Sequence, residues 1–247
     1  MRRFWLPAAR FLIGMGFGFF LLPISVQAAP AREKPAIPAV RWDEQTPGCT
    51  FSHSDDGKLH YGLWSGDVGI TLSLDSQELE KVRRRHEQFF GVLLNIRYRG
   101  QGALDVTTEN ISLEFLTHFK TIQTSLDPDA FAQKLQDDAD EMDHATAREI
   151  EKHPETKPAK EAYLRAFQKD TAELLEFISK NSLRSVRLDP GNQEVSGWVL
   201  FTAGSKWIGK CKRPEEFILR VPLDGKIFEF PFSLPPKPSD IMLRRRE

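Results

Sequence analysis

Residues 187–201 of the chain read RLDPGNQEVSGWVLF, a turn followed by an apolar run. Pro190 fixes its own φ angle and Gly191 can take a left-handed backbone conformation, so this Asp-Pro-Gly-Asn segment predicts a tight turn. Gly197 then leaves room for close packing, and Trp198 with the three apolar residues after it can fill both faces of a strand. The stretch therefore predicts one strand of a packed sheet, with Trp198 as a packing residue and not a ligand-stacking one.

The same strand pattern recurs earlier in the chain. Apolar residues alternate with polar or small ones in residues 67–74 (DVGITLSL), 90–99 (FGVLLNIRYR) and 111–119 (ISLEFLTHF), which is the period of a strand with one buried face. Such strands are typical of antiparallel sheets that leave the other face in water. Because a sheet with one apolar face must be covered, we expect a sandwich of about seven strands.

A last pair of strands flanks Asp224-Gly225, a dipeptide that tolerates the positive φ angles of a two-residue hairpin turn. Pro222 and Pro231 lie within these strands and cannot donate backbone hydrogen bonds. Their presence predicts that this hairpin lies at a sheet edge or contains bulges.

The pattern becomes helical between residues 127 and 180. Asp127 is a good N-cap and Pro128 suits a first helical turn. A helix is predicted to about residue 152, a break over the Pro-containing residues 153–158, and a second helix over 159–180. Together they predict an αα-hairpin. Apolar residues recur near helical spacing at Phe131, Leu135, Met142 and Ala145, and at Tyr163, Phe167, Leu174, Leu175 and Ile178.

The order of the strand segments resembles a known family. GITLSL, VLLNIRYRG and ISLEF are followed by LDPGNQEVSGWVLF and EEFILRVPL. This order is similar to that of the telokin-like, immunoglobulin-fold domains of unknown function found in exported bacterial proteins. The resemblance covers roughly residues 62–123 and 183–233, and implies an extracytoplasmic, antiparallel immunoglobulin-like β-sandwich with no catalytic residues. The departure is the αα-hairpin at about 127–181, which the plain domain lacks.

The N-terminus predicts export. Three arginines precede the apolar residues 11–24, and Val26-Gln27-Ala28 provides the small residues of a cleavage site, so we expect a signal peptide over 1–28 that is cleaved after Ala28. The apolar run has 14 residues, fewer than the ~20 that span a bilayer. The alternative is a retained membrane anchor that includes residues 4–7. Cleavage leaves a periplasmic or secreted protein with no stable membrane span.

The mature chain is predicted to have three parts. Residues 29–47 are rich in proline and alanine and predict a linker. Residues 48–233 form the sandwich with its inserted hairpin, and residues 234–247 form a flexible basic tail.

Charge argues against a polyanionic partner. Cleavage removes three arginines and no acidic residue, which changes the formal net charge from −1 to −4. A mildly acidic chain has no bulk attraction for nucleic acid or anionic lipid. Residues 127–180 hold 14 acidic and 8 basic residues, so negative charge is concentrated on the predicted helices.

Cys49 and Cys211 are the only cysteines. In an oxidising compartment an even number of cysteines favours a disulfide, and two separately buried thiols are the alternative. The chain has no Cys-x-x-Cys motif, so we interpret the predicted bond as a structural one.

Two pairs of side chains suggest metal binding. Glu141 and His144 lie three residues apart on a predicted helix, as in the Glu-x-x-His units of di-iron bundles, which need four helices and a second such unit. His53 and His60 flank an Asp-Asp-Gly turn, and a hairpin could bring their imidazoles together. A solvated acidic helix face and a polar hairpin tip explain these residues without a metal, so no metal or cofactor is predicted.

Other motifs are incomplete. Residues 86–90 (HEQFF) lack the second histidine of a zinc-protease helix. Residues 81–86 (KVRRRH) form a short basic run that could meet a polyanion, and residues 110–112 (NIS) match a glycosylation acceptor. No Gly-x-Ser-x-Gly or Ser-x-x-Lys motif is present.

These observations favour a non-catalytic interaction or structural module of the bacterial cell envelope. Its expected partner is another envelope or secreted protein, bound by the helical hairpin. The alternatives are a metal-dependent envelope hydrolase, which would use His53, His60, Glu141 or His144, and a periplasmic chaperone or assembly factor.

Overall fold

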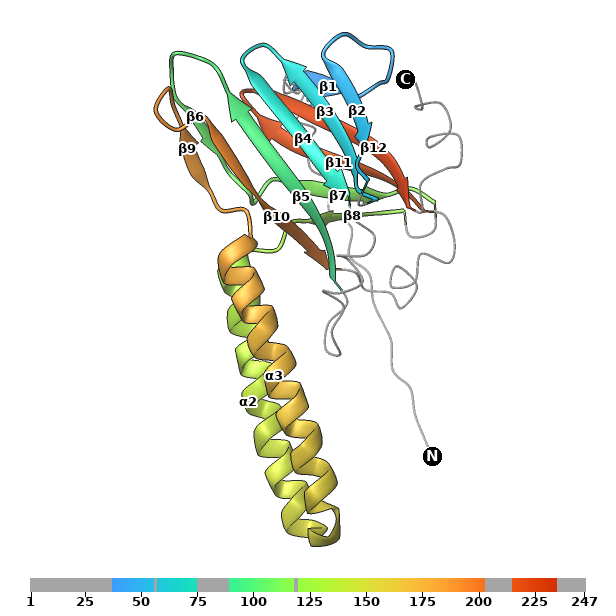
Figure 1. Cartoon of the computed structure of the whole chain (residues 1–247), viewed down its shortest axis with the longest axis vertical. Helices are drawn as coiled ribbons and strands as arrows, with labels where there is room; N and C mark the ends of the chain where they lie inside the picture. The colour runs from blue at the N-terminus through green and yellow to red at the C-terminus, as the bar shows by residue number, and fades with distance from the viewer. Residues whose placement is uncertain (1–36, 56, 75–88, 118–119, 203–214, 235–247) are drawn as a thin grey trace, which may run out of the picture. The chain divides into compact units, whose positions relative to one another are not determined.

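Two five-stranded sheets and two long helices make up most of the computed structural model, which describes residues 37–55, 57–74, 89–117, 120–202 and 215–234 (Figure 1). The first sheet has the order β1 (Ala39–Arg41), β12 (Lys226–Leu234), β11 (Glu215–Leu223), β7 (Ser112–Phe115), β8 (Thr121–Thr124). The second has the order β10 (Glu194–Thr202), β5 (Phe89–Tyr98), β4 (Val68–Leu74), β3 (Leu59–Ser65), β2 (Cys49–His53). A small third sheet pairs β6 (Leu104–Val106) with β9 (Val186–Leu188).

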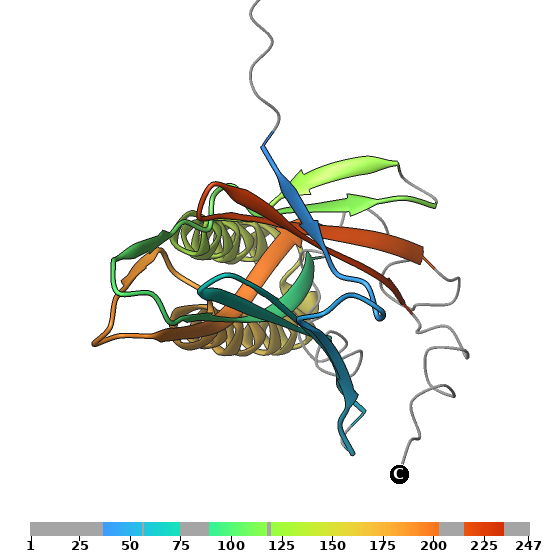
Figure 2. The ribbon, with the colours of Figure 1, turned by 90° about the horizontal axis from the view of Figure 1, so that it is seen from above.

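Both five-stranded sheets contribute to one hydrophobic cluster, here called the main core. Leu72 and Leu94 of the second sheet and Leu113, Leu219 and Phe230 of the first are completely buried in it. Figure 2 shows the strands of the first sheet above those of the second. The structure is therefore mainly β, as the alternating patterns predict.

The predicted strand faces are confirmed in β5. Val92, Leu94 and Ile96 are buried in the main core, whereas Arg97 and Arg99 on the opposite face are exposed. In β4 the prediction of one wet face is wrong, because the outward residues are also covered. The indole of Trp64, for example, lies directly against Gly69, where a β-carbon would be only 2.4 Å from Trp64 Cε2.

The chain enters the first sheet earlier than predicted. Residues 39–41 form β1, which pairs in parallel with β12, and the Trp42 side chain is buried in the main core. The prediction of a linker over residues 29–47 is therefore wrong from residue 39. The parallel pair also makes this sheet mixed and not purely antiparallel.

The two strand prolines lie inside the sheet and not at its edge. β12 lies between β1 and β11, and β11 lies between β12 and β7. Pro222 and Pro231 are tolerated because their neighbours are short: β7 pairs with β11 only as far as Arg220, and β1 pairs with β12 only as far as Glu229. No ladder hydrogen bond is lost where the neighbouring strand has already ended.

Of the two predicted turns, one has the expected backbone conformation and the other does not. Asp224 and Gly225 both have positive φ angles, as a two-residue hairpin turn requires. In the opening stretch, Asp189 and Asn192 exchange two backbone hydrogen bonds of 3.0 Å. There the Asp189 carboxylate accepts the Gly191 amide at 2.8 Å, and Gly191 does not adopt the left-handed conformation.

The helices α2 (Pro128–Lys152) and α3 (Lys157–Asn181) lie side by side, joined by the short helix η1 (Pro154–Thr156) (Figure 1). Asp127 caps α2 as predicted, since its carboxylate accepts the Ala130 amide at 2.7 Å. The start of α3 is two residues earlier than predicted, because Pro158 falls in the first turn, where it is tolerated. The predicted apolar stripe is wrong at Tyr163, which is 45% exposed.

Candidate functional site: the exposed face of the helical pair

The helical pair is tied to one strand at both ends. Just before α2, the Leu126 amide donates to the Leu200 carbonyl at 2.7 Å, and just after α3, the Leu183 amide donates to the Trp198 carbonyl at 2.8 Å. The two acceptors lie on β10. The two ends of the helical pair are therefore held at nearly the same place on the second sheet.

A second hydrophobic cluster, here called the base cluster, fixes the near end of the helices. It consists of Phe89 and Leu200 from the strands, Phe131 and Leu135 from α2, and Leu174 and Ile178 from α3. Val199 and Phe201, which flank Leu200, belong to the main core instead. Because neighbouring strand residues point to opposite faces, the base cluster lies on the outward face of the second sheet.

Trp198 and two glycines complete this junction. The Trp198 ring lies 5.8 Å from the ring of Phe177, and a β-carbon on Gly91 would be 3.1 Å from Trp198 Cε3. At Gly197 a β-carbon would be 2.5 Å from the Leu183 nitrogen. The prediction that Gly197 permits close packing is therefore confirmed, and Trp198 packs against α3.

An ion pair closes the junction from the solvent side. Arg184 donates to the Asp129 carboxylate at 2.7 Å, which links the first turn of α2 to the segment after α3. This hydrogen bond holds the pKa of Asp129 below its ordinary value. No short-range pattern indicates this pair, since 55 positions separate the two residues.

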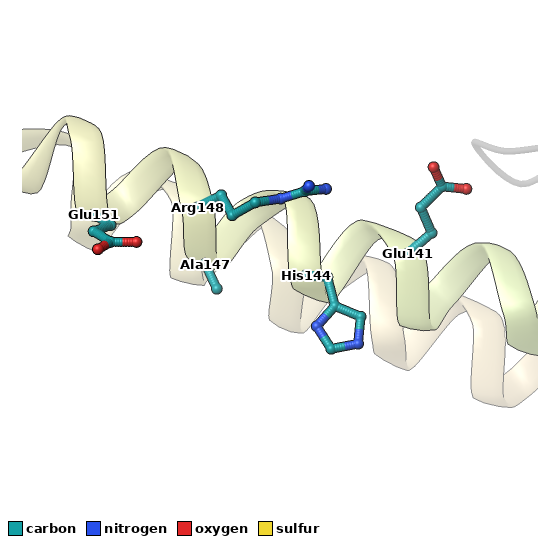
Figure 3. Close-up of a pocket in the computed structure, with 5 residues that line it drawn as sticks. All are labelled: Glu141, His144, Ala147, Arg148 and Glu151. Carbon is teal, nitrogen blue, oxygen red and sulfur yellow. The ribbon is translucent and has the colours of Figure 1, made fainter.

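Beyond the base cluster the helices expose polar side chains. The described residues that line a shallow depression on α2 are Glu141, His144, Ala147, Arg148 and Glu151 (Figure 3). We call these five residues the outer face of α2. Within Pro128–Lys152 there are eight acidic and three basic residues, against four acidic and five basic in Lys157–Asn181. The acidic charge predicted for the hairpin is thus carried by α2.

The outer face does not bring metal ligands together. In Figure 3 the carboxylate of Glu141 points away from the imidazole of His144. Among the residues that the structure describes, no three histidine, cysteine, aspartate or glutamate side chains form a group that could hold a metal ion. What this face offers is an exposed helical surface with both signs of charge around a small residue, Ala147.

The structure separates the two histidines of the β2–β3 turn. His60 is paired with Ser52 across the strands, whereas His53 is paired with Leu59. Directly paired residues share a face of the sheet and successive residues alternate, so the two imidazoles lie on opposite faces. The hypothesis that His53 and His60 approach each other is therefore wrong.

Several predictions fall outside the described residues. They concern the signal peptide over 1–28, the basic run 81–86, the histidine of the segment 86–90 and the tail beyond residue 234. Cys49 is half-buried at the start of β2, but Cys211 also lies outside the described residues. The disulfide stays a prediction.

Comparison of the chain with protein-family models, with curated proteins and with solved structures gave no match. In the described part of the chain, no helix combines the length and the hydropathy needed to cross a membrane.

Proposed function

We propose that this chain is an exported interaction or structural module of the bacterial cell envelope. Its fold is proposed to be a telokin-like, immunoglobulin-like β-sandwich with an αα-hairpin inserted at about residues 127–181. The main core, to which both five-stranded sheets contribute, supports the sandwich. The two helices between β8 and β9 support the insertion.

The observation that carries the proposal is the contrast between the fixed near end of the hairpin and the exposed outer face of α2. The near end is fixed by the base cluster, by two backbone hydrogen bonds to β10 and by the Asp129–Arg184 pair. The outer face of α2, in contrast, consists of exposed side chains. A firmly held helix with an exposed charged surface presents a partner with a preorganised contact, which lowers the entropic cost of binding.

The proposed partner is another envelope or secreted protein, and Ala147 provides the sharpest test. Ala147 is the small exposed residue of the outer face, so Ala147→Arg places a long side chain where the partner would bind. Ala162→Arg makes the same change at an exposed position of α3 and is the matched control. Both variants keep the base cluster, which unfolding midpoints will verify.

Cross-linking in native envelopes, followed by mass spectrometry, provides the readout. A partner captured by the unmodified protein should be lost with Ala147→Arg and kept with Ala162→Arg. A further variant replaces residues 142–169 by a short glycine-containing turn, removing the far half of the hairpin but keeping the base cluster, and should also lose the partner. If these variants all capture the same partner as the unmodified protein, the hairpin is not the contact surface.

A further inference from the structure

A histidine held between two serines lies on the outward face of the second sheet. Leu59 and Tyr61, the neighbours of His60 in β3, are buried in the main core, so His60 points the other way. Its Nε2 atom is 2.6 Å from Ser54 Oγ and its Nδ1 atom is 2.7 Å from Ser73 Oγ. Both ring nitrogens therefore have a hydroxyl partner.

The fold positions each member of this group separately. His60 and Ser73 are directly paired between β3 and β4, so the strand register brings Ser73 to Nδ1. Ser54 is held by the β2–β3 turn, where its amide donates to the Lys58 carbonyl at 2.9 Å and its carbonyl accepts the Gly57 amide at 3.0 Å. Ser73 is 8% exposed, whereas Ser54 is only half-buried. The outermost hydroxyl of the group is thus the one that solvent can reach.

Hydrogen-bond chemistry leaves two tautomers open to His60, and one of them makes a catalytic group of the three residues. A neutral imidazole has one N–H donor and one acceptor nitrogen. If the Ser73 hydroxyl accepts the Nδ1 proton, the lone pair of Nε2 faces the Ser54 hydroxyl. This is the arrangement of a nucleophile, a base and a residue that orients the base.

We propose that Ser54 is a histidine-activated nucleophile for acyl transfer from esters. His60 acts as the general base and Ser73 is a positioning residue. Ser54 Oγ forms a bond to the ester carbonyl carbon while its proton passes to His60 Nε2. The carbon–oxygen bond to the leaving alcohol then breaks, and the alcohol takes that proton. Water attacks the acyl group by the same route, which releases the acid and restores Ser54.

The neutral partner of Nδ1 limits the substrate class. A carboxylate at this position would stabilise the imidazolium that forms during the reaction, but the Ser73 hydroxyl carries no charge. We therefore expect reaction with activated aryl esters and with fluorophosphonates, whose leaving groups need little assistance.

A fluorophosphonate probe tests the proposal on the full mature chain. The probe forms a phosphorus–oxygen bond to a serine with loss of fluoride, and intact mass and peptide mapping locate it. We expect one adduct, on Ser54, absent from Ser54→Ala. His60→Gln should slow labelling about 10²- to 10⁴-fold, the usual contribution of general-base catalysis. Ser52→Ala is the matched control, since Ser52 is exposed on the same face directly opposite His60, and it should label at the original rate.

Ser73 needs a readout that separates positioning from stability. Ser73→Ala should slow labelling, whereas Ser73→Thr, which keeps the hydroxyl, should restore it, with both unfolding midpoints measured. The proposal is overturned if Ser54 gives no adduct, if another serine reacts instead, or if His60→Gln labels at the original rate. None of these results bears on the hairpin variants, so failure here is distinguishable from failure of the proposed interaction role.

Discussion

Gly197→Ala is expected to loosen the junction between the helices and the second sheet. The added β-carbon would lie 2.5 Å from the Leu183 nitrogen, 2.6 Å from its α-carbon and 2.9 Å from the Ser182 carbonyl carbon. These are backbone atoms, which cannot move aside by changing rotamer, so β10 and the segment after α3 must separate. Overpacking of this kind costs about 1–3 kcal/mol, and loss of the Leu183–Trp198 hydrogen bond adds about 1 kcal/mol.

The expected total is a loss of about 2–4 kcal/mol in the free energy of unfolding, measured by urea denaturation. For a chain of this size that corresponds to a decrease in Tm of about 5–15 °C. Gly102→Ala is the control, because its β-carbon would meet only Tyr98 Oη at 3.4 Å. Amide exchange of Leu183 should become faster in the Gly197 variant alone. The reasoning fails if Gly197→Ala is as stable as the control and its Leu183 amide keeps its protection.

Three further predictions concern other contacts. Ile178→Ala should destabilise the protein by about 2–4 kcal/mol because Ile178 is fully buried in the base cluster. Leu164 is only half-buried, so Leu164→Ala should lower the free energy of unfolding by less than half as much in the same denaturation assay. Arg220→Met should cost about 1–2 kcal/mol in that assay, since Arg220 is one-quarter exposed and bridges two glutamates; an unchanged midpoint would contradict this. Hydrogen bonds from Asn95, and then from a neighbouring arginine, lower the pKa of Glu194. The ionised Glu194 therefore stabilises the folded protein above the pKa of an unfolded glutamate, and this stabilisation is lost as the pH falls through the lowered value. NMR titration should show this lowered midpoint, and Asn95→Ala should raise it.

Local sequence patterns predicted the elements whose contacts are regular. Alternation identified β4, β5 and β7, and the Asp127-Pro128 cap identified the first residue of α2. The strand predictions succeeded because alternating side chains directly reflect one buried face. The helix prediction succeeded because a cap depends on residues that are adjacent in the chain.

What could not be predicted depends on residues far apart in the chain. β1 is only three residues long and lies in a proline-rich region, and it is a strand because β12 is beside it. The contacts of His60 depend on the β3–β4 register, which places Ser73 opposite it. Arg184 contacts Asp129 because the helical pair brings the start of α2 beside the segment after α3. In each case tertiary packing determines the partner, and short-range periodicity does not indicate it.

The pairing of β1 with β12 also constrains when the molecule can finish folding. Arg41 lies opposite Glu229, and the Trp42 amide donates to the Glu229 carbonyl at 2.8 Å. A contact between the two extremes of the chain has a high contact order and forms late. During synthesis, β1 cannot pair until nearly the whole polypeptide has emerged. Until then β1 has no strand to pair with, although the Trp42 ring can already meet Phe51 and Tyr61, which follow closely in the chain.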